Sequence, residues 1–382
     1  MTTIRVRTCA LIIFAFLLTC LPVIRSFGRQ EGSVAYPCAA FALDGRSATG
    51  DFVARALHVT VTNTAGMTRV ADLPLEDPPG YCRLFFPSHA NYLVAAVGFV
   101  TESKYWFRIG MLDTDTRKWI STLNLEPRRG TGSRFDLEGF LKNSSDLVFS
   151  EYGSNEIGLS PAPTLREILT PDGKVDRPTK FAATWGFVDS RHNRLWLYRD
   201  PHPCPLRSVT LIGDPAEGPT INEKALGALG CGDGLVLLAF PDQDTVLGTA
   251  ARSDGDWVWR ADLASGQGQQ LKLPQAKEAG TIRTDSDVEG GSSSPDGQVF
   301  AVARTITAWD ADKRPHEMPG EIAVTEVKPL RLLGIVKPKS GCPRADAFSV
   351  DHRNGQATVL AHWCGTWERI HLPDTAVTSS GK

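Results

Sequence analysis

The chain has 382 residues, of which 42% are hydrophobic and 22% are charged. This composition is typical of a folded globular protein and excludes a largely disordered one. Forty-one Lys and Arg residues against 43 Asp and Glu residues give a formal net charge of −2. No overall field therefore attracts nucleic acid or an anionic membrane, and nucleic acid is not an expected partner.

The first 29 residues have the features of an export signal. Arg5 and Arg7 precede an apolar stretch, Cys9 to Ile24, which is shorter than the ~20 residues that a membrane-spanning helix requires. We therefore expect a signal peptide and a secreted or periplasmic protein. No clean cleavage site follows, and Leu17 to Cys20 resembles a lipidation signal with Thr19 in place of a small residue. The alternative is a membrane-anchored protein held by an uncleaved or lipidated N-terminus, with its folded domain outside the cytoplasm.

Six cysteines follow this segment, and an even number in an oxidising compartment predicts up to three disulfides. They are Cys38, Cys82, Cys204, Cys231, Cys342 and Cys364. Their order along the chain favours pairing each with its neighbour, namely Cys38 with Cys82, Cys204 with Cys231, and Cys342 with Cys364. An alternative pairs Cys342 with Cys38, if the two ends of the domain are neighbours. No pair has the spacing of a zinc site.

A strand, turn and strand pattern recurs seven times along the chain. Its clearest copy is Ser294-Pro295-Asp296-Gly297 followed by the alternating run Gln298 to Val302. The copies begin at Phe41, Phe86, Phe140, Phe187, Phe240, Ser293 and Phe348, at steps of 45, 54, 47, 53, 53 and 55 residues. Such a period accommodates four strands, and second hairpins are visible at Leu57 to Leu73, Ile109 to Leu123 and Trp257 to Leu273.

This repeat predicts an all-β protein, a β-propeller of seven four-stranded blades. The expected domains are the signal peptide or anchor at 1–29, the propeller at 30–373 and a flexible tail at 374–382. Ser294 to Gly297 and the later turn Asp262 to Gly266 resemble WD40-like and TolB-like propeller repeats, over about residues 34 to 373. The resemblance implies a fold and leaves the activity open. The chain departs from the pattern because its Trp309-Asp310 pair lies in a predicted insertion, Thr307 to Pro319, and closes no blade.

Two acidic segments echo each other ahead of a first turn, Asp136 to Gly139 and Asp287 to Gly290. We predict that both lie in or beside long connections, one from Pro127 to Phe135 and one from Gln275 to Gly291. Facing a central channel, their carboxylates would suit a hard cation such as Ca²⁺. The candidate ligands are Asp136, Glu138, Asp285, Asp287 and Glu289. The favoured interpretation is that they are solvated or cap backbone amides, so no cofactor is expected.

No motif for covalent catalysis, phosphate binding or dinucleotide binding is present. The histidines do not cluster, and neither His362 nor His371 has an acid at a spacing that indicates a proton relay. Most tryptophans are expected in the core, with Trp309 and Trp367 more exposed. The sequence therefore favours a binding or scaffolding module, with a protein, peptide or glycan on one face of the ring. The alternative is an extracytoplasmic hydrolase or lyase with a divalent cation in the channel.

Overall fold

The structure is a computed structural model, and it describes only part of the chain. The described ranges are 37–76, 80–86, 91–100, 105–125, 134–140, 147–152, 164–169, 175–181, 185–189, 194–198, 206–210, 217–221, 235–242, 245–252, 255–262 and 267–372. From 134 to 242 only the backbone is described. The chain divides into Met1–Val34 and Ala35–Lys382, and every described residue belongs to the second unit. The predicted signal segment, the tail at 374–382, Cys204 and Cys231 lie outside the described residues.

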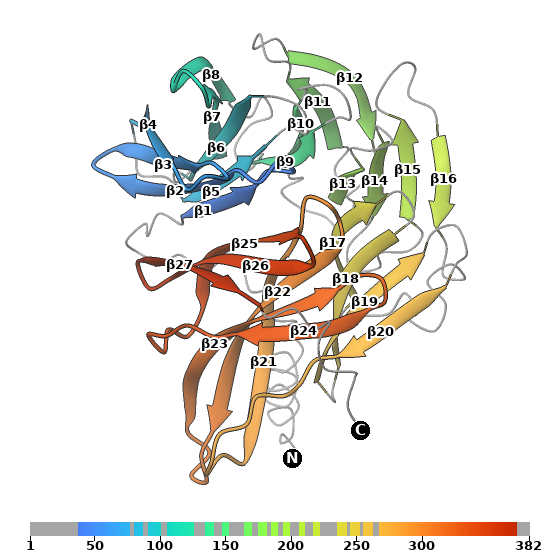
Figure 1. Cartoon of the computed structure of the whole chain (residues 1–382). Helices are drawn as coiled ribbons and strands as arrows, with labels where there is room; N and C mark the ends of the chain where they lie inside the picture. Colours follow the sequence, from blue (N-terminus) through green and yellow to red (C-terminus); the bar gives the residue numbers. More distant parts are fainter. Residues whose placement is uncertain are drawn as a thin grey trace, which may run out of the picture. The chain divides into compact units, whose positions relative to one another are not determined.

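The described residues form seven antiparallel sheets and no helix, as predicted for an all-β protein (Figure 1). Strands that follow one another in the chain lie side by side in each sheet. Sheet 1 contains β1 (Cys38–Phe41), β2 (Ser47–Val53), β3 (Ala56–Thr62) and β4 (Thr68–Pro74). Sheet 2 contains β5 (Tyr81–Phe85), β6 (Tyr92–Val100), β7 (Tyr105–Asp113) and β8 (Lys118–Leu125). Sheet 3 contains β9 (Arg134–Phe140), β10 (Leu147–Tyr152), β11 (Thr164–Leu169) and β12 (Val175–Phe181). Sheet 4 contains β13 (Trp185–Asp189), β14 (Arg194–Tyr198), β15 (Leu206–Thr210) and β16 (Glu217–Ile221).

The last three sheets complete the series. Sheet 5 contains β17 (Leu235–Asp242), β18 (Thr245–Arg252), β19 (Gly255–Asp262) and β20 (Gly268–Lys272). Sheet 6 contains β21 (Arg283–Ser293), β22 (Val299–Trp309), β23 (Pro315–Glu326) and β24 (Arg331–Val336). Sheet 7 contains β25 (Ala345–Arg353), β26 (Gln356–Trp363) and β27 (Thr366–His371), so it has three strands among the described residues.

Local turn chemistry explains where these hairpins form. Each of the seven predicted first turns joins the first and second strands of one sheet. In sheet 6, Asp296 Oδ1 accepts hydrogen bonds from Ser294 Oγ at 2.6 Å and from the Gln298 N–H at 3.0 Å, while Gly297 has a φ of 73°. In sheet 7, Asn354 and Gly355 both have positive φ, as a two-residue hairpin turn requires.

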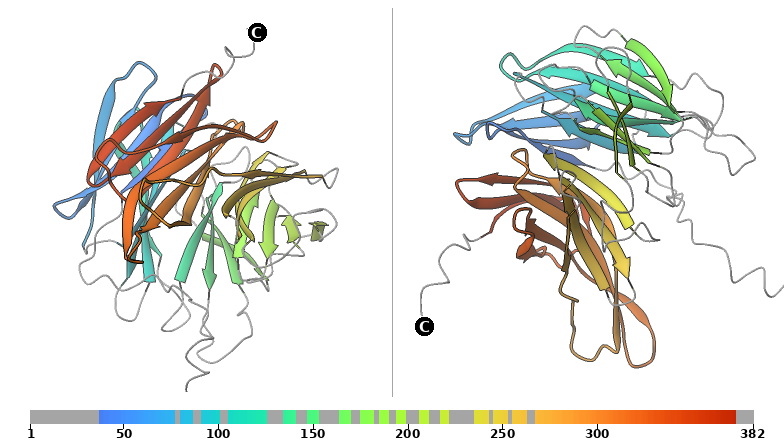
Figure 2. Two further views of the ribbon diagram at one scale, coloured as in Figure 1. Left: turned by 90° about the horizontal axis from the view of Figure 1, so that it is seen from below. Right: turned by 90° about the vertical axis from the view of Figure 1, so that its right-hand side faces the viewer.

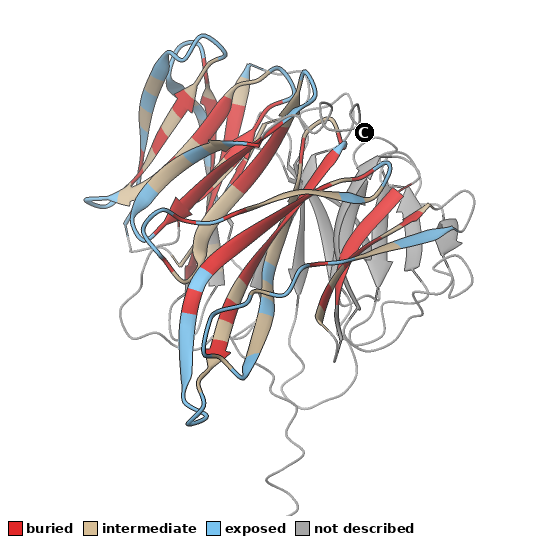
Figure 3. Cartoon of the chain, turned by 60° about the horizontal axis from the view of Figure 1, so that its bottom comes forward, coloured by how far each residue is buried: buried red, intermediate tan, exposed pale blue. Residues whose placement is uncertain are grey.

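Consecutive sheets pack through apolar faces. First strands contact each other from sheet to sheet, for example β1 with β5 and β17 with β21, and β25 also contacts β1. One buried cluster joins sheets 1 and 2, with Leu57 and Leu93 fully buried, and others join sheets 5 to 6 and 6 to 7 (Figure 3). Removing these side chains from water stabilises the stack by about 25 cal/mol per Å² of apolar surface.

Sheets 7 and 1, at opposite ends of the described chain, are joined by polar contacts. Trp367 Nε1 lies 2.9 and 3.1 Å from the two carboxylate oxygens of Asp51, to which it donates a hydrogen bond. Arg369 Nη2 donates to Ser47 Oγ at 2.6 Å.

Trp259, in sheet 5, is buried, as expected for a tryptophan in the core.

Two disulfides agree with the predicted order. Cys38–Cys82 links β1 to β5, and Cys342–Cys364 links the residues before β25 to the turn between β26 and β27. Their Cα atoms are 5.5 and 6.0 Å apart. The alternative pairing of Cys342 with Cys38 is wrong, because each of these cysteines is bonded to another partner.

Three predicted connections are strands instead. Arg283–Ser293, assigned by sequence to the loop from Gln275 to Gly291, is the eleven-residue β21. The predicted insertion, Thr307 to Pro319, continues β22 and β23 as a long hairpin that turns at Asp310 to Arg314. Asp136 to Gly139 likewise lies within β9. Backbone pairing with a neighbouring strand orders these segments despite their polar side chains.

Polar contacts also join the first turns of sheets 6, 7 and 1. His352 Nδ1, on β25, lies 2.8 Å from Asp296 Oδ2, and Arg353 Nη2 donates to the Ala42 carbonyl at 2.7 Å. Burial opposes ionisation of Asp296, but hydrogen bonds from Ser294, the Gln298 N–H and His352 outweigh it and lower its pKa. At Asp351 burial outweighs the adjacent Arg353 guanidinium, so the pKa of this carboxyl is raised.

These directions predict how Asp296 affects stability at different pH values. A lowered carboxyl pKa stabilises the folded state above the unfolded value of 3.8, and this contribution is lost as the pH falls through the folded pKa. Replacing Asp296 with Asn should therefore cost about 1 kcal/mol at pH 6, and this cost should shrink at pH 3. Urea unfolding of both proteins from pH 6 to pH 3 measures the difference. For Asp351→Asn, whose carboxyl pKa is raised, the cost should instead grow as the pH falls. A cost of Asp296→Asn that stays the same from pH 6 to pH 3 would contradict the lowered pKa of Asp296.

Candidate functional site

Part of sheet 6 extends beyond the rest of the sheets (Figures 1 and 2). We call residues 283–288, 304–309 and 315–320 the sheet 6 extension; they belong to β21, β22 and β23. Breaks in strand register lie at its base, between Val288 and Gly290 and between Arg304 and Ile306. Because side chains alternate across a strand, the extension has two distinct faces.

The inner face of the extension is covered by the connection between β20 and β21. Ile306, Ala308 and Met318 form a small buried cluster against Ala276 of this connection. Thr284 Oγ1 donates to the Ala276 carbonyl at 2.9 Å, and His316 Nε2 lies 2.8 Å from Glu278 Oε2. The connection is thereby held along the extension.

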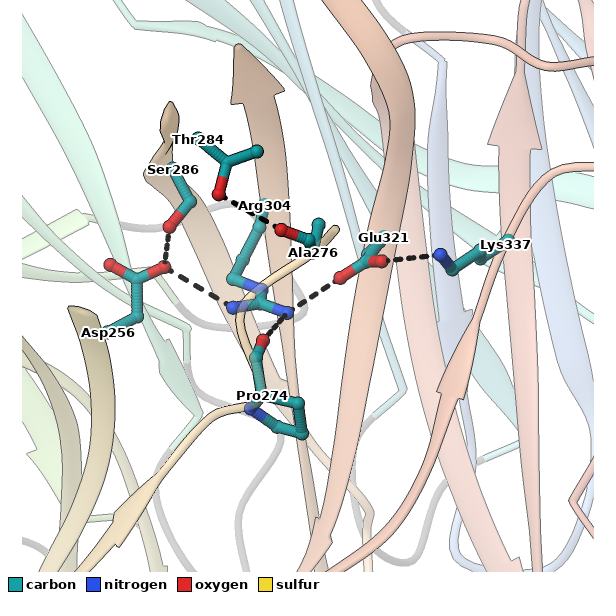
Figure 4. A network of polar contacts seen from close by, with 8 residues as sticks. All are labelled: Asp256, Pro274, Ala276, Thr284, Ser286, Arg304, Glu321 and Lys337. Atoms are coloured by element: carbon teal, nitrogen blue, oxygen red, sulfur yellow. Dashed lines mark hydrogen bonds and ion pairs between the residues drawn. The ribbon is translucent and has the colours of Figure 1, made fainter. Parts of the chain in front are cut away.

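A buried charge network lies at the base of the same face (Figure 4). Arg304 Nη2 is 2.6 Å from Glu321 Oε2 and 3.1 Å from the Pro274 carbonyl, while Arg304 Nη1 is 3.4 Å from Asp256 Oδ2. Arg304, Asp256 and Glu321 are only 2%, 3% and 2% exposed. Asp256 lies on β19 of sheet 5 and Arg304 lies on β22 of sheet 6, so the guanidinium connects these two sheets.

Two further contacts complete this network. Ser286 Oγ donates to the Asp256 carboxylate, and Lys337 Nζ lies 2.8 Å from Glu321 Oε1. Two cations therefore face two carboxylates, and the formal charge of the set is zero. The planar guanidinium suits such a two-sided contact better than an ammonium group. The network positions the base of the extension, and its formal charges balance one another.

The outer face carries acids that the sequence singled out. Asp285, Asp287 and Glu289 share one face of β21, and strand pairing adds Thr305, Thr307, Trp309 and Glu317 from β22 and β23. Asp285 accepts a hydrogen bond from Trp309 Nε1 at 3.1 Å and pairs with Arg283 Nε at 2.7 Å. Thr305 Oγ1 donates to Glu289 Oε1 at 3.0 Å. Four carboxylates and one guanidinium give this face a formal charge of −3.

The predicted cation ligands fall on two sheets. Asp285, Asp287 and Glu289 lie on β21, the first strand of sheet 6, whereas Asp136 and Glu138 lie on β9, the first strand of sheet 3. The side chains of the second pair are outside the described residues. Among side chains that are described, no group of three or more His, Cys, Asp or Glu residues is arranged to hold a metal ion. The calcium site therefore stays a prediction.

Two expectations about side chains can be set beside the structure. No local spacing places an acid beside His362, but strand pairing does, because its Nδ1 lies 3.1 Å from Asp346 Oδ2 across the β25–β26 pair. Trp309 and Trp367, expected to be more exposed than the other tryptophans, are half-buried whereas Trp259 and Trp363 are buried, and each of the first two donates its indole N–H to an aspartate. These partners are distant along the chain, so no local spacing indicates them.

The network around Arg304 was not predicted from the sequence. One signal was available, since Arg304 interrupts an otherwise apolar run that begins at Val299 in a strand-like segment. A charged residue in a buried strand needs a charged partner. The identity of the partners, Asp256 and Glu321, requires the paired strands.

Among the described residues, no helix has the length and apolar character needed to cross a membrane. No family model matches the sequence, and no curated protein matches it.

Solved structures do resemble the chain. Hydrazine synthase from Kuenenia stuttgartiensis is 10% identical, with a TM-score of 0.51 over 92% of this chain and 100% of that chain. A mutant of prolyl oligopeptidase B from Galerina marginata is 11% identical, with a TM-score of 0.48 over 90% and 49% of the two chains. Chaetomium thermophilum Sqt1, bound to the N-terminus of ribosomal protein L10, is 12% identical, with a TM-score of 0.44 over 87% and 84%. At 10% identity the likeness to hydrazine synthase, whose TM-score is above 0.5, concerns the fold alone, and it supports a propeller-like arrangement.

Proposed function

We propose that the chain is an exported seven-bladed β-propeller that acts as a binding or scaffolding module for a protein or peptide. Seven sheets that contact one another in chain order, with β25 against β1, support the blade count. Two disulfides support an oxidising compartment, because such bonds are rare in reducing ones. Sheet 7 would be the incomplete blade.

One observation carries the assignment of the binding surface, namely the outer face of the sheet 6 extension. Asp287, Glu289 and Glu317 are exposed on it, and Trp309 adds a half-buried indole at its far end. The other face is covered and fixed by the Arg304 network, so the exposed acids lie on a rigid sheet. A negative surface of this kind favours a partner with net positive charge, through faster association and through rejection of acidic partners.

A charge-neutralising variant tests this function. The probe is an array of extended dodecapeptides with net charges of +4, 0 and −4. We expect the full chain to bind the peptides with a net charge of +4. The double variant Asp287→Asn with Glu317→Gln should weaken this binding at least about tenfold, or ~1.4 kcal/mol. The matched control is Glu76→Gln with Asp115→Asn, which removes two exposed acids elsewhere and should change binding less than about twofold.

Two outcomes would overturn this assignment. Equal weakening by the control pair would make the effect one of net charge alone, and unchanged retention of the +4 peptides by Asp287→Asn with Glu317→Gln would remove the outer face from consideration. Stoichiometric calcium in the purified protein would instead support the alternative, a hydrolase or lyase that uses the acids of β9 and β21.

A further inference from the structure

In the part of the chain that the structure describes, no strand pairs with the outer edge of sheet 7. In sheets 1 and 5 the third strand is followed by a fourth, and neither β3 nor β19 has an exposed residue. The third strand of sheet 7, β27, is the last of its sheet in the described part of the chain. Three of its residues are exposed, Thr366, Arg369 and His371. Its exposure is therefore that of an edge strand.

The register of β27 shows which backbone groups face outward. The Leu372 N–H donates to the Ala357 carbonyl at 2.9 Å, and the pairing continues with Thr358 opposite His371. Hydrogen bonds between antiparallel strands involve alternate residues. The N–H and C=O groups of Trp367, Arg369 and His371 consequently point away from β26. A row of such groups is a template for another strand.

Side chains on the two faces of β27 define what an added strand would meet. Arg369 and His371 share the face toward sheet 1, where Ser47 Oγ accepts a hydrogen bond from Arg369 and the guanidinium lies 5.5 Å from the Phe41 ring centroid. Ile370 faces the opposite way and packs with Leu333 against the core between sheets 6 and 7. The edge therefore combines one side that carries Arg369 and His371 with another that carries Ile370 and the half-buried Glu368.

We propose that β27 binds an extended segment of a partner protein by strand addition, and that this segment alternates acidic with apolar residues. An acidic residue opposite Arg369 would form a cross-strand charge pair with the guanidinium, a second would lie opposite the His371 imidazole, and the intervening residues would lie beside Ile370. A second copy of this chain fits poorly, because symmetric pairing centred on Arg369 brings two guanidinium groups opposite each other. This site shares no residue with the sheet 6 extension.

The test uses a fluorescein-labelled octapeptide of alternating Glu and Val, measured by anisotropy with the full chain. In antiparallel addition, the Glu residues lie opposite Arg369 and His371 and donate their N–H groups to β27. N-methylation of the Glu amides should weaken binding at least about tenfold, whereas N-methylation of the Val amides should change it less than about threefold. In the protein, His371→Pro removes an outward N–H and should weaken binding as strongly, whereas His371→Ala keeps that N–H and should have a small effect.

Three results would overturn the proposal. They are equal effects of the two methylation patterns, equal effects of His371→Pro and His371→Ala at unchanged melting temperature, and slow amide exchange of Trp367, Arg369 and His371 in the free protein. The last would mean that residues of the chain itself occupy the edge. Asp287→Asn with Glu317→Gln should leave octapeptide binding unchanged, so failure here is distinguishable from failure of the extension as a binding surface.

Discussion

Replacing Arg304 with Leu is expected to lower the free energy of unfolding by about 3–5 kcal/mol. The substitution leaves Asp256 and Glu321 buried at 3% and 2% exposure without the guanidinium between them. Because water does not solvate either carboxylate, the loss of stability should be far larger than the loss of one exposed ion pair. Urea unfolding followed by tryptophan fluorescence measures the change.

Lys337 provides the matched control, because it contacts the same Glu321 from an exposed position. Its side chain is 56% exposed, so Lys337→Ala should cost no more than about 1 kcal/mol. Amide exchange along β21 should also be faster in Arg304→Leu, because Asp256, the hydrogen-bond acceptor of Ser286 on β21, is no longer held in place. A loss for Arg304→Leu as small as that for Lys337→Ala would mean that the network contributes little to holding sheets 5 and 6 together.

The sequence was sufficient for the hairpins because their signals are local. Asp296 and Gly297 form the turn that their chemistry predicts, and the run after them alternates as a strand does. The same logic located the first turns throughout the chain and the second hairpins at Leu57 to Leu73 and Trp257 to Leu273. Cysteine order gave the two disulfides that the structure describes.

The sheet 6 extension could not be predicted in this way. β21 has polar residues on both faces along most of its length, so it lacks the apolar alternation that marks a half-buried strand. Its order depends on backbone pairing with β22 and on contacts with the Ala276 segment. Sequence reasoning identified Asp285, Asp287 and Glu289 as a set within a predicted loop, whereas the strand places all three on one face. The Trp309 and Glu317 side chains join that set only through pairing.

The second large effect concerns the Cys38–Cys82 disulfide. Replacing both residues with Ala should lower the free energy of unfolding by about 4 kcal/mol, because the bond closes a loop of 44 residues and the unfolded chain gains freedom without it. Cys342–Cys364 closes only 22 residues, so the corresponding double variant should lose about 3 kcal/mol. Urea midpoints under non-reducing conditions compare the two variants with the unmodified chain.

The location of each bond makes the comparison informative. Cys38 and Cys82 both belong to the core between sheets 1 and 2, whereas Cys342 and Cys364 flank the strands of sheet 7. Loss of the first bond should therefore loosen the contact between sheets 1 and 2, seen as faster amide exchange in β1 and β5, while the second should affect sheet 7. Full reduction of the unmodified chain should cost at least as much as the larger single loss. If reduction leaves the unfolding midpoint unchanged, the disulfides are dispensable, and the cysteine argument for an oxidising compartment loses its physical basis.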